Sequence, residues 1–284
     1  MSERRSPELM EMQRIEAERS EMKRTTERLL REAFTGILSE EELEHRLKAV
    51  ADTVFVNEQD FDRLLEEHPD EADAAGVMRV EVKDGKIRRY AVVKQATRAE
   101  QLHSLAHETT HLMAPDSYFV TKIWQDDDAD KTYSVYIGPL RHERFVENGK
   151  VDPLSMELAD RKPRQRILFW EAVTDWHADE LLRNELTDEE KEEIETTGYL
   201  ERQYISYLID QSPDREELIK AIRTTYAEGN EDPFRWALHK ITDRKDDQMY
   251  EALLDVLKIP LEQWEERVDL WMGVVQKYFS TKSK

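Results

Sequence analysis

His107-Glu108-Thr109-Thr110-His111 is the stretch of this sequence that decides the fold. On an α-helix, residues four apart lie on one face, so the imidazoles of His107 and His111 can both reach a single metal ion. Glu108 follows the first of these histidines and lies beside the ion, where its carboxylate can take a proton from a water that zinc activates. The pattern therefore predicts a zinc site on a helix, with His107 and His111 as ligands and Glu108 as the general base.

A catalytic zinc usually takes a third protein ligand, and the sequence offers more than one candidate. Glu171 and Asp175 lie one turn apart in a strongly helical stretch, so Glu171 can coordinate zinc while Asp175 accepts a hydrogen bond from a ligand imidazole. His142, in the connection expected after residue 138, is the alternative third ligand. His103 and His177 are expected to be packing or surface residues, because three histidines at four-residue spacing cannot converge and His177 points away from Glu171.

The two motifs together resemble those of the gluzincin zinc metallopeptidases, in which HExxH is followed by a Glu ligand on a later helix. The likeness is greatest to the small bacterial minigluzincins and related toxin-like peptidases, whose second motif is similar to Trp-Glu-Ala-Val-Thr-Asp at 170–175 and whose preceding strand is similar to Tyr-Ile-Gly-Pro-Leu at 136–140. The resemblance covers roughly residues 77 to 210. It departs at Trp170, where Asn is common, at the inserted Pro139, and in the long spacing of about 60 residues before Glu171.

This resemblance implies a zinc metallopeptidase that acts on a peptide or protein substrate, with Zn²⁺ held by His107, His111 and Glu171. Gluzincins also supply a donor to the oxyanion of the reaction from a residue after the Glu-bearing helix. Tyr199 is the first candidate for that role and Tyr204 the second, because both follow the helix closely.

The expected elements give an α+β fold with a zincin-like core, made of a small β-sheet, the helix with HExxH and the helix with Glu171, and extended by helices at both ends. Residues 1–33 have the apolar spacing of a long amphipathic helix, and Ser39 with Glu42 is a capping box that opens a second one. Two strands at 77–82 and 87–93 flank Asp84-Gly85 and predict a hairpin. The predicted segments are an N-terminal helical segment (1–40), a metallopeptidase core (41–212) and a C-terminal helical subdomain (213–284).

Three further stretches lie near the predicted site. Residues 118–124 and 132–137 are expected to pair as strands around the acidic loop 125–131, which reads as a solvated hairpin loop because it lacks the Gly and closing Glu of a calcium loop. Residues 141–165 are expected to form an irregular excursion over the cleft. The strand at 87–94 is a candidate for the sheet edge to which an extended substrate would pair.

Composition limits the classes of function. The net charge of −21 over 284 residues disfavours a nucleic-acid partner, and the N-terminus lacks the apolar core of a signal peptide. No stretch approaches 18 apolar residues, which argues against a membrane span. The absence of cysteine excludes disulfides and thiolate ligands. A cytoplasmic protein is the expectation.

The sequence is also compatible with two other hypotheses. The chain can be a non-catalytic zinc-binding regulatory or scaffold protein whose helical ends bind a protein partner. Alternatively, residues 1–40 can occupy the cleft of a peptidase and hold it inactive. The Glu at position 108 favours catalysis over a structural zinc, because a structural site needs no base beside its ligands.

Overall fold

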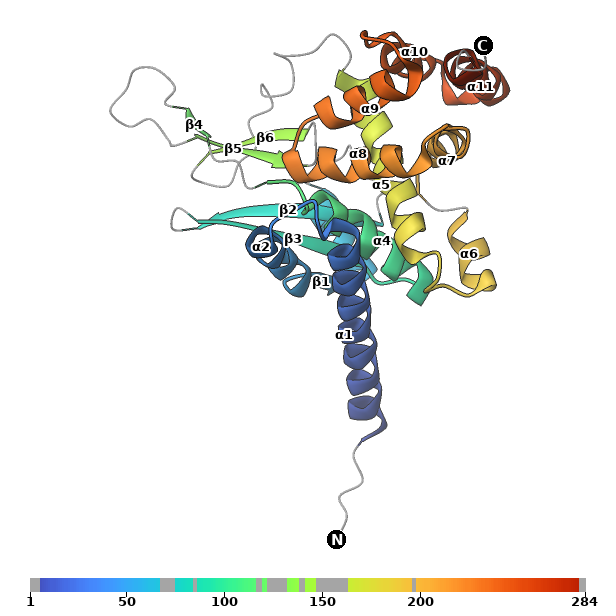
Figure 1. Cartoon of the computed structure of the whole chain (residues 1–284). Helices are drawn as coiled ribbons and strands as arrows, with labels where there is room; N and C mark the ends of the chain where they lie inside the picture. The colour runs from blue at the N-terminus through green and yellow to red at the C-terminus, as the bar shows by residue number, and fades with distance from the viewer. Residues whose placement is uncertain are drawn as a thin grey trace.

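The computed structural model describes residues 6–66, 75–83, 86–115, 119–121, 132–137, 141–146, 163–195 and 198–280. Over these ranges the chain is mostly helical and contains two small three-stranded sheets (Figure 1). The predicted α+β class is therefore confirmed.

The predicted N-terminal helix is α1 (Pro7–Phe34), which begins at Ser6, whose hydroxyl caps the first turn. Its two halves differ in environment, since Leu30 and Phe34 are fully buried whereas Met12 is 67% exposed. In Figure 1 the N-terminal half projects away from the rest of the chain. The following helix, α2 (Glu40–Ala51), opens with the predicted capping box of Ser39 and Glu42.

A three-stranded sheet supports one side of the site. Its strands are β1 (Val54–Val56), β2 (Gly76–Lys83) and β3 (Lys86–Lys94), in the order β1-β3-β2, with β1 parallel and β2 antiparallel to β3. Side chains alternate between its faces. Val77 and Val92, which are cross-strand partners, pack with α3 (Glu58–Leu65), whereas Met78 and Val93 belong to the main core. The central strand is β3, so the candidate edge at 87–94 is wrong, and β1 and β2 are the two outer strands of this sheet.

The HExxH motif lies in α4 (Arg98–His111), as predicted, and the helix opens with the capping box of Thr97 and Glu100. This helix contacts β2 and β3 on one side and α1, α5 and α6 on others. It is therefore buried along nearly its whole length, from Gln101 to His111. A helix enclosed in this way has fixed side-chain directions, which is what a metal site requires.

The second sheet consists of β4 (Phe119–Thr121), β5 (Thr132–Ile137) and β6 (Arg141–Val146), which pair antiparallel in that order. The expected pairing of the stretches around 118–124 and 132–137 is thus confirmed. The prediction of irregular structure from residue 141 is wrong for 141–146, because these residues pair with β5. The acidic loop 125–131 and the stretch 147–162 lie outside the described residues.

The rest of the described chain is helical. The long helix α5 (Pro163–Leu182) crosses α4 and also contacts α7 and α10. The other elements are α6 (Asp188–Glu195), α7 (Arg202–Asp210), α8 (Arg215–Glu228), α9 (Asp232–Thr242), α10 (Gln248–Val256), the short 3₁₀ helix η3 (Leu261–Gln263) and α11 (Trp264–Phe279). Among the described residues, no helix combines the length and the apolar character needed to cross a lipid bilayer.

One hydrophobic cluster runs through the described chain, from Met22 in α1 to Phe279 in α11. Residues from all three predicted segments contribute to it, and α5 supplies Phe169, Ala172 and Val173, which are fully buried. The proposed boundaries at 40 and 212 stay a prediction, because a shared core does not locate them.

Candidate metal centre

The crossing of α4 and α5 brings His107, His111 and Glu171 together. The Nε2 atoms of the two histidines are 3.2 Å apart, and Glu171 Oε2 lies 3.2 Å from the first and 3.3 Å from the second. Among the described residues, these three form the group of histidine and acidic side chains that can hold a metal ion. Helical spacing alone predicts that His107 and His111 lie together. The third candidate ligand, Glu171, lies 60 residues further along the chain and is brought to them by the fold.

These three distances fit a zinc ion. Ligand atoms that lie about 2.0–2.1 Å from a tetrahedral zinc are about 3.3 Å from one another. The observed triangle has sides of 3.2, 3.2 and 3.3 Å. Hydrogen bonds alone do not explain it, because the two Nε2 atoms carry at most one hydrogen each and there are three contacts to satisfy. A neutral imidazole pair with one carboxylate is also a donor set that zinc accepts.

Asp175 fixes the orientation of His107 from behind. Its Oδ1 lies 2.6 Å from His107 Nδ1, so the imidazole donates its Nδ1 hydrogen to the carboxylate and presents Nε2 toward His111 and Glu171. The other oxygen, Oδ2, accepts a hydrogen bond from the backbone N–H of Tyr199. Asp175 is only 2% exposed, so this arrangement is locked within the core. It is the role that the sequence spacing predicted for this residue.

The electrostatics of the centre favour a cation. Burial disfavours the charged form of His107, but hydrogen bonds to Asp175 and Glu171 outweigh it, and the pKa of His107 lies well above its ordinary value. Burial likewise opposes ionisation of Glu171, yet His111 and His107 hold the pKa of that carboxyl well below its usual range. The ionised carboxylates of Glu171 and Asp175 therefore face the imidazoles in a buried site, and their negative charge attracts a metal cation.

Glu108 lies beside the ligand triangle without being part of it. The nearest approach of its carboxylate to His107 Nε2 is 4.0 Å, and its side chain is 10% exposed. The outer strand β2 packs directly against it: a Cβ added at Gly76 would lie 3.0 Å from Glu108 Cγ. The carboxylate is thus close enough to serve a water at the centre but too far from it to complete the same triangle of ligands.

The two candidate tyrosines have different environments. Tyr199 lies next to the centre, with its ring stacked on that of His107 at a centroid distance of 6.3 Å, and it is 38% exposed. Tyr204 is 3% exposed and stacks between Trp264 and Trp271. Tyr204 is therefore a packing residue of the α7–α11 contact, and Tyr199 is the one that borders the centre.

The alternative histidines are placed elsewhere. His103 is buried one turn before the centre and pairs with Asp179 at 3.1 Å. His142 lies on β6 opposite Tyr136, so its expected place in a loop is wrong, and its side chain is outside the described part of the structure.

His177 is fully buried and contacts α4, although its spacing from Glu171 suggested the opposite direction. Its Nδ1 lies 3.3 Å from Thr110 Oγ1, and its Nε2 accepts a hydrogen bond from Arg223 Nε. Burial and then the charge of Arg223 lower the pKa of His177 to about 3, so the ring is neutral. This support for the HExxH helix has no sequence signature, since it joins three helices that are distant in the chain.

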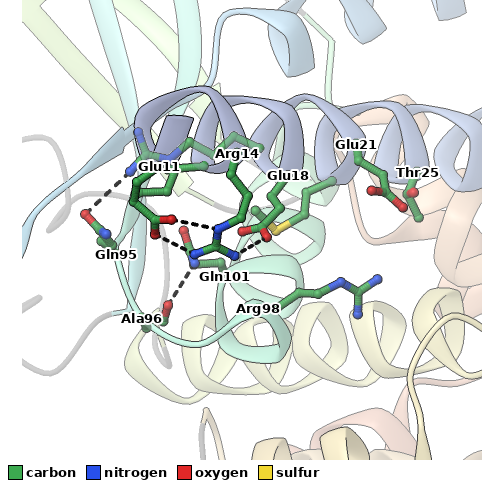
Figure 2. A pocket seen from close by; sticks show the side chains of 12 residues that line it. Glu11, Arg14, Glu18, Glu21, Thr25, Gln95, Ala96, Arg98 and Gln101 are labelled. Atoms are coloured by element: carbon green, nitrogen blue, oxygen red, sulfur yellow. Dashed lines mark hydrogen bonds and ion pairs between the residues drawn. The ribbon is translucent and has the colours of Figure 1, made fainter. Parts of the chain in front are cut away.

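A separate pocket of about 250 Å³ lies between the N-terminal half of α1 and the segment that joins β3 to α4 (Figure 2). Arg14 is held there between Glu11 and Glu18, and Gln101 donates to the carbonyl of Ala96. None of the residues of the metal centre lines this pocket. It is a polar groove in which Arg14 is paired with two glutamates, whereas Arg98 pairs with Glu190 outside the lining.

Comparisons of the chain with protein-family models, with curated proteins and with solved structures found no match. The geometry of the candidate metal centre is therefore the basis for proposing a function.

Proposed function

We propose that this chain is a zinc-dependent peptidase of the gluzincin type, with a zincin-like core in which His107, His111 and Glu171 hold the ion. The observation that carries the proposal is the triangle of ligand atoms with sides of 3.2–3.3 Å, formed where α4 crosses α5. A structural zinc usually has four protein ligands, whereas a catalytic one has three and an open position. The presence of three candidate ligands in the described chain, with Glu108 beside them, supports catalysis over a scaffold role.

Zinc in such a site supplies Lewis-acid chemistry, making water a nucleophile at neutral pH and polarising a carbonyl. The residues around it would do the rest. Glu108 accepts the proton of the attacking water and later gives it to the leaving amine, as a general base and then a general acid. Asp175 keeps His107 in the tautomer whose Nε2 would be free to bind the ion. The hydroxyl of Tyr199 is the candidate donor to the developing oxyanion.

The position of β2 supports a peptide as the substrate. This strand is one of the two outer strands of its sheet and lies against Glu108 at Gly76. An extended peptide can add to an outer strand through main-chain hydrogen bonds, which would place a scissile bond near the carboxylate of Glu108. Because Gly76 has no side chain, β2 can lie this close to Glu108.

The first test is the metal content of the purified wild type and of Glu171→Ala, measured side by side by mass spectrometry. We expect about one zinc per chain in the wild type and clearly less in the variant, because a three-ligand site loses a charged donor. Equal zinc in both would assign the third ligand to another residue, with His142 the next to be replaced. No zinc in either protein would remove the hydrolase proposal and leave the scaffold hypothesis.

The second test separates catalysis from mere metal binding. Glu108→Gln preserves the size of the side chain but removes the base, so we expect full zinc occupancy and a rate lower by roughly 10²–10⁴-fold on a fluorogenic peptide library. Glu100→Gln, at the exposed start of the same helix, is the matched control and should keep the wild-type rate. Undiminished hydrolysis in Glu108→Gln would exclude the role proposed for Glu108.

A further inference from the structure

The connection between α6 and α7 touches the metal centre through a tight turn at Gly198 and Tyr199. Gly198 has a φ of +75°, a conformation that residues with a side chain rarely adopt. This turn directs the backbone N–H of Tyr199 to Oδ2 of Asp175. The same carboxylate accepts the Nδ1 hydrogen of His107 through Oδ1, at 2.6 Å. Asp175 is thus held on both of its oxygens, one by the turn and one by the ligand histidine.

The turn also leaves no room for a side chain at position 198. A Cβ added there would overlap Asp175 Oδ2 and lie 3.0 Å from its Cγ. The carboxylate has little freedom to retreat, since Asp175 is 2% exposed. Any side chain at 198 therefore either displaces Asp175 or opens the turn, and both outcomes change the hydrogen bond to His107.

We propose that Gly198 is a positioning residue for the His107 imidazole, acting through Asp175. The turn presses the carboxylate against His107 and supplies the backbone donor that sets its rotation, so the orientation of a metal ligand on α4 depends on a glycine in the α6–α7 connection. The inference rests on the proposed function only where zinc affinity is the readout. The contacts that it concerns, from Gly198 and Tyr199 through Asp175 to His107 Nδ1, involve none of the three ligand atoms.

Gly36 provides a matched control for Gly198. It has a similar φ of +80°, but a Cβ added there would meet nothing within 4 Å. Gly36→Ala therefore carries the same backbone strain without a collision, and a difference between the two variants isolates the contact with Asp175. Strain alone would affect the stability of both proteins and the metal centre of neither.

The first experiment uses metal-free protein and proton NMR. The hydrogen in the short His107–Asp175 bond should give a downfield resonance, assigned by its loss in Asp175→Ala. We expect Gly198→Ala to shift or abolish this resonance and Gly36→Ala to leave it unchanged. An unaltered resonance in Gly198→Ala would overturn the inference, whether or not the protein binds zinc.

The second experiment is a double-mutant cycle on zinc affinity, measured by competition with a chromophoric chelator. Gly198→Ala and Asp175→Ala should each raise the Kd for zinc roughly 10–100-fold. In the double variant the collision is gone, so its Kd should equal that of Asp175→Ala alone. Additive effects would contradict the coupling. A wild type that binds no zinc would defeat the proposed function instead, and the NMR result would still decide the role of Gly198.

Folding of the variants is checked by circular dichroism. If Gly198→Ala alone fails to fold, the collision model requires that the double variant with Asp175→Ala folds again, because the obstructing carboxylate has been removed. Failure of both would overturn the inference, since the defect would then lie in the turn and not in its contact with Asp175.

Discussion

Two aspartates on α5, one turn apart, illustrate how position decides the role of a residue. Asp175 is 2% exposed and binds His107, whereas Asp179 is 35% exposed at its side chain and pairs with His103. Only the first is connected to the ligand triangle. The same chemical change at the two sites should therefore have different consequences.

We predict that Asp175→Asn weakens zinc binding roughly 10–100-fold. The amide keeps the shape of the carboxylate but loses its charge, and one of its ends would direct an NH₂ group at either His107 Nδ1–H or the Tyr199 N–H. Asp179→Asn is the control and should leave zinc affinity as it is. Chelator competition measures both, and equal Kd values for Asp175→Asn and the wild type would argue against the orienting hydrogen bond.

His177 should give the protein an acid-sensitive stability. Its pKa is about 3 in the folded chain and has an ordinary value of 6.5 when unperturbed. Between these values the unfolded state binds one more proton, so its contribution to stability is complete above pH 6.5 and is lost as the pH falls. The free energy of unfolding should decrease by about 1.4 kcal/mol per pH unit from this group.

The variant His177→Gln tests this assignment, because its amide can still accept from Arg223 and donate to Thr110. Urea unfolding between pH 6.5 and 4 should show a shallower pH dependence for the variant than for the wild type. Parallel curves would mean that another group causes the acid sensitivity.

At the scale of elements, α1 is a structural part of the core. Leu30 and Phe34 are fully buried among residues of the main cluster. We predict that Leu30→Ala lowers the free energy of unfolding by about 2–5 kcal/mol, because it leaves a cavity. Met12→Ala, on the projecting half of the helix, should change it by less than about 0.5 kcal/mol. Urea denaturation measures both, and similar values would contradict the division of α1 into two halves.

The same division shows how inhibition by the N-terminus can be tested. A deletion up to Ser39 would remove Met22, Leu30 and Phe34 from the core, so loss of activity would report unfolding. A deletion of residues 1–12 leaves this core intact, because the described residues that it removes, 6–12, are all exposed. An increase in activity after this shorter deletion would support an inhibitory segment.

Helices and strands could be predicted from the sequence where the residues that determine them are close together in the chain. The capping boxes of Ser39 with Glu42 and Thr97 with Glu100 locate two helix starts, because both partners lie within one turn. β6 was not recognised, since Arg141 to Val146 carries charged residues and its pairing with β5 is a contact between strands. The order of strands also escaped prediction, because β1 joins β3 in parallel from a distant part of the chain.

In the candidate site, too, the residues that are close together in the chain could be predicted. His107, Glu108 and His111 are recognisable in the sequence because a helix places them within one turn. Glu171 and Asp175 could be proposed as a pair from their spacing and from the resemblance, but only the crossing of α4 and α5 brings them to His107. The contribution of Gly198 had no signal at all, because a left-handed glycine becomes informative only when its neighbour, here Asp175, is known.

At the scale of the whole molecule, the candidate metal centre lies between two parts of the core. α4 packs on β2 and β3, whereas α5 packs on α7 and α10. An ion held by two residues of α4 and one of α5 would bind these two parts to each other. Such an ion binds only the folded chain, because its three ligands are dispersed when the chain unfolds.

Metal binding should therefore stabilise the whole chain. At a free zinc concentration of 100 times the Kd, the gain is about 2.7 kcal/mol, and the melting temperature should rise by several degrees relative to chelated protein. Scanning calorimetry of wild type and Glu171→Ala, each with zinc and with chelator, measures this gain. The variant should show a much smaller rise, since it retains only the two ligands of α4 and loses the connection to α5. An equal rise in both proteins would mean that zinc acts at another site, and no rise in either would mean that the triangle of His107, His111 and Glu171 does not hold an ion.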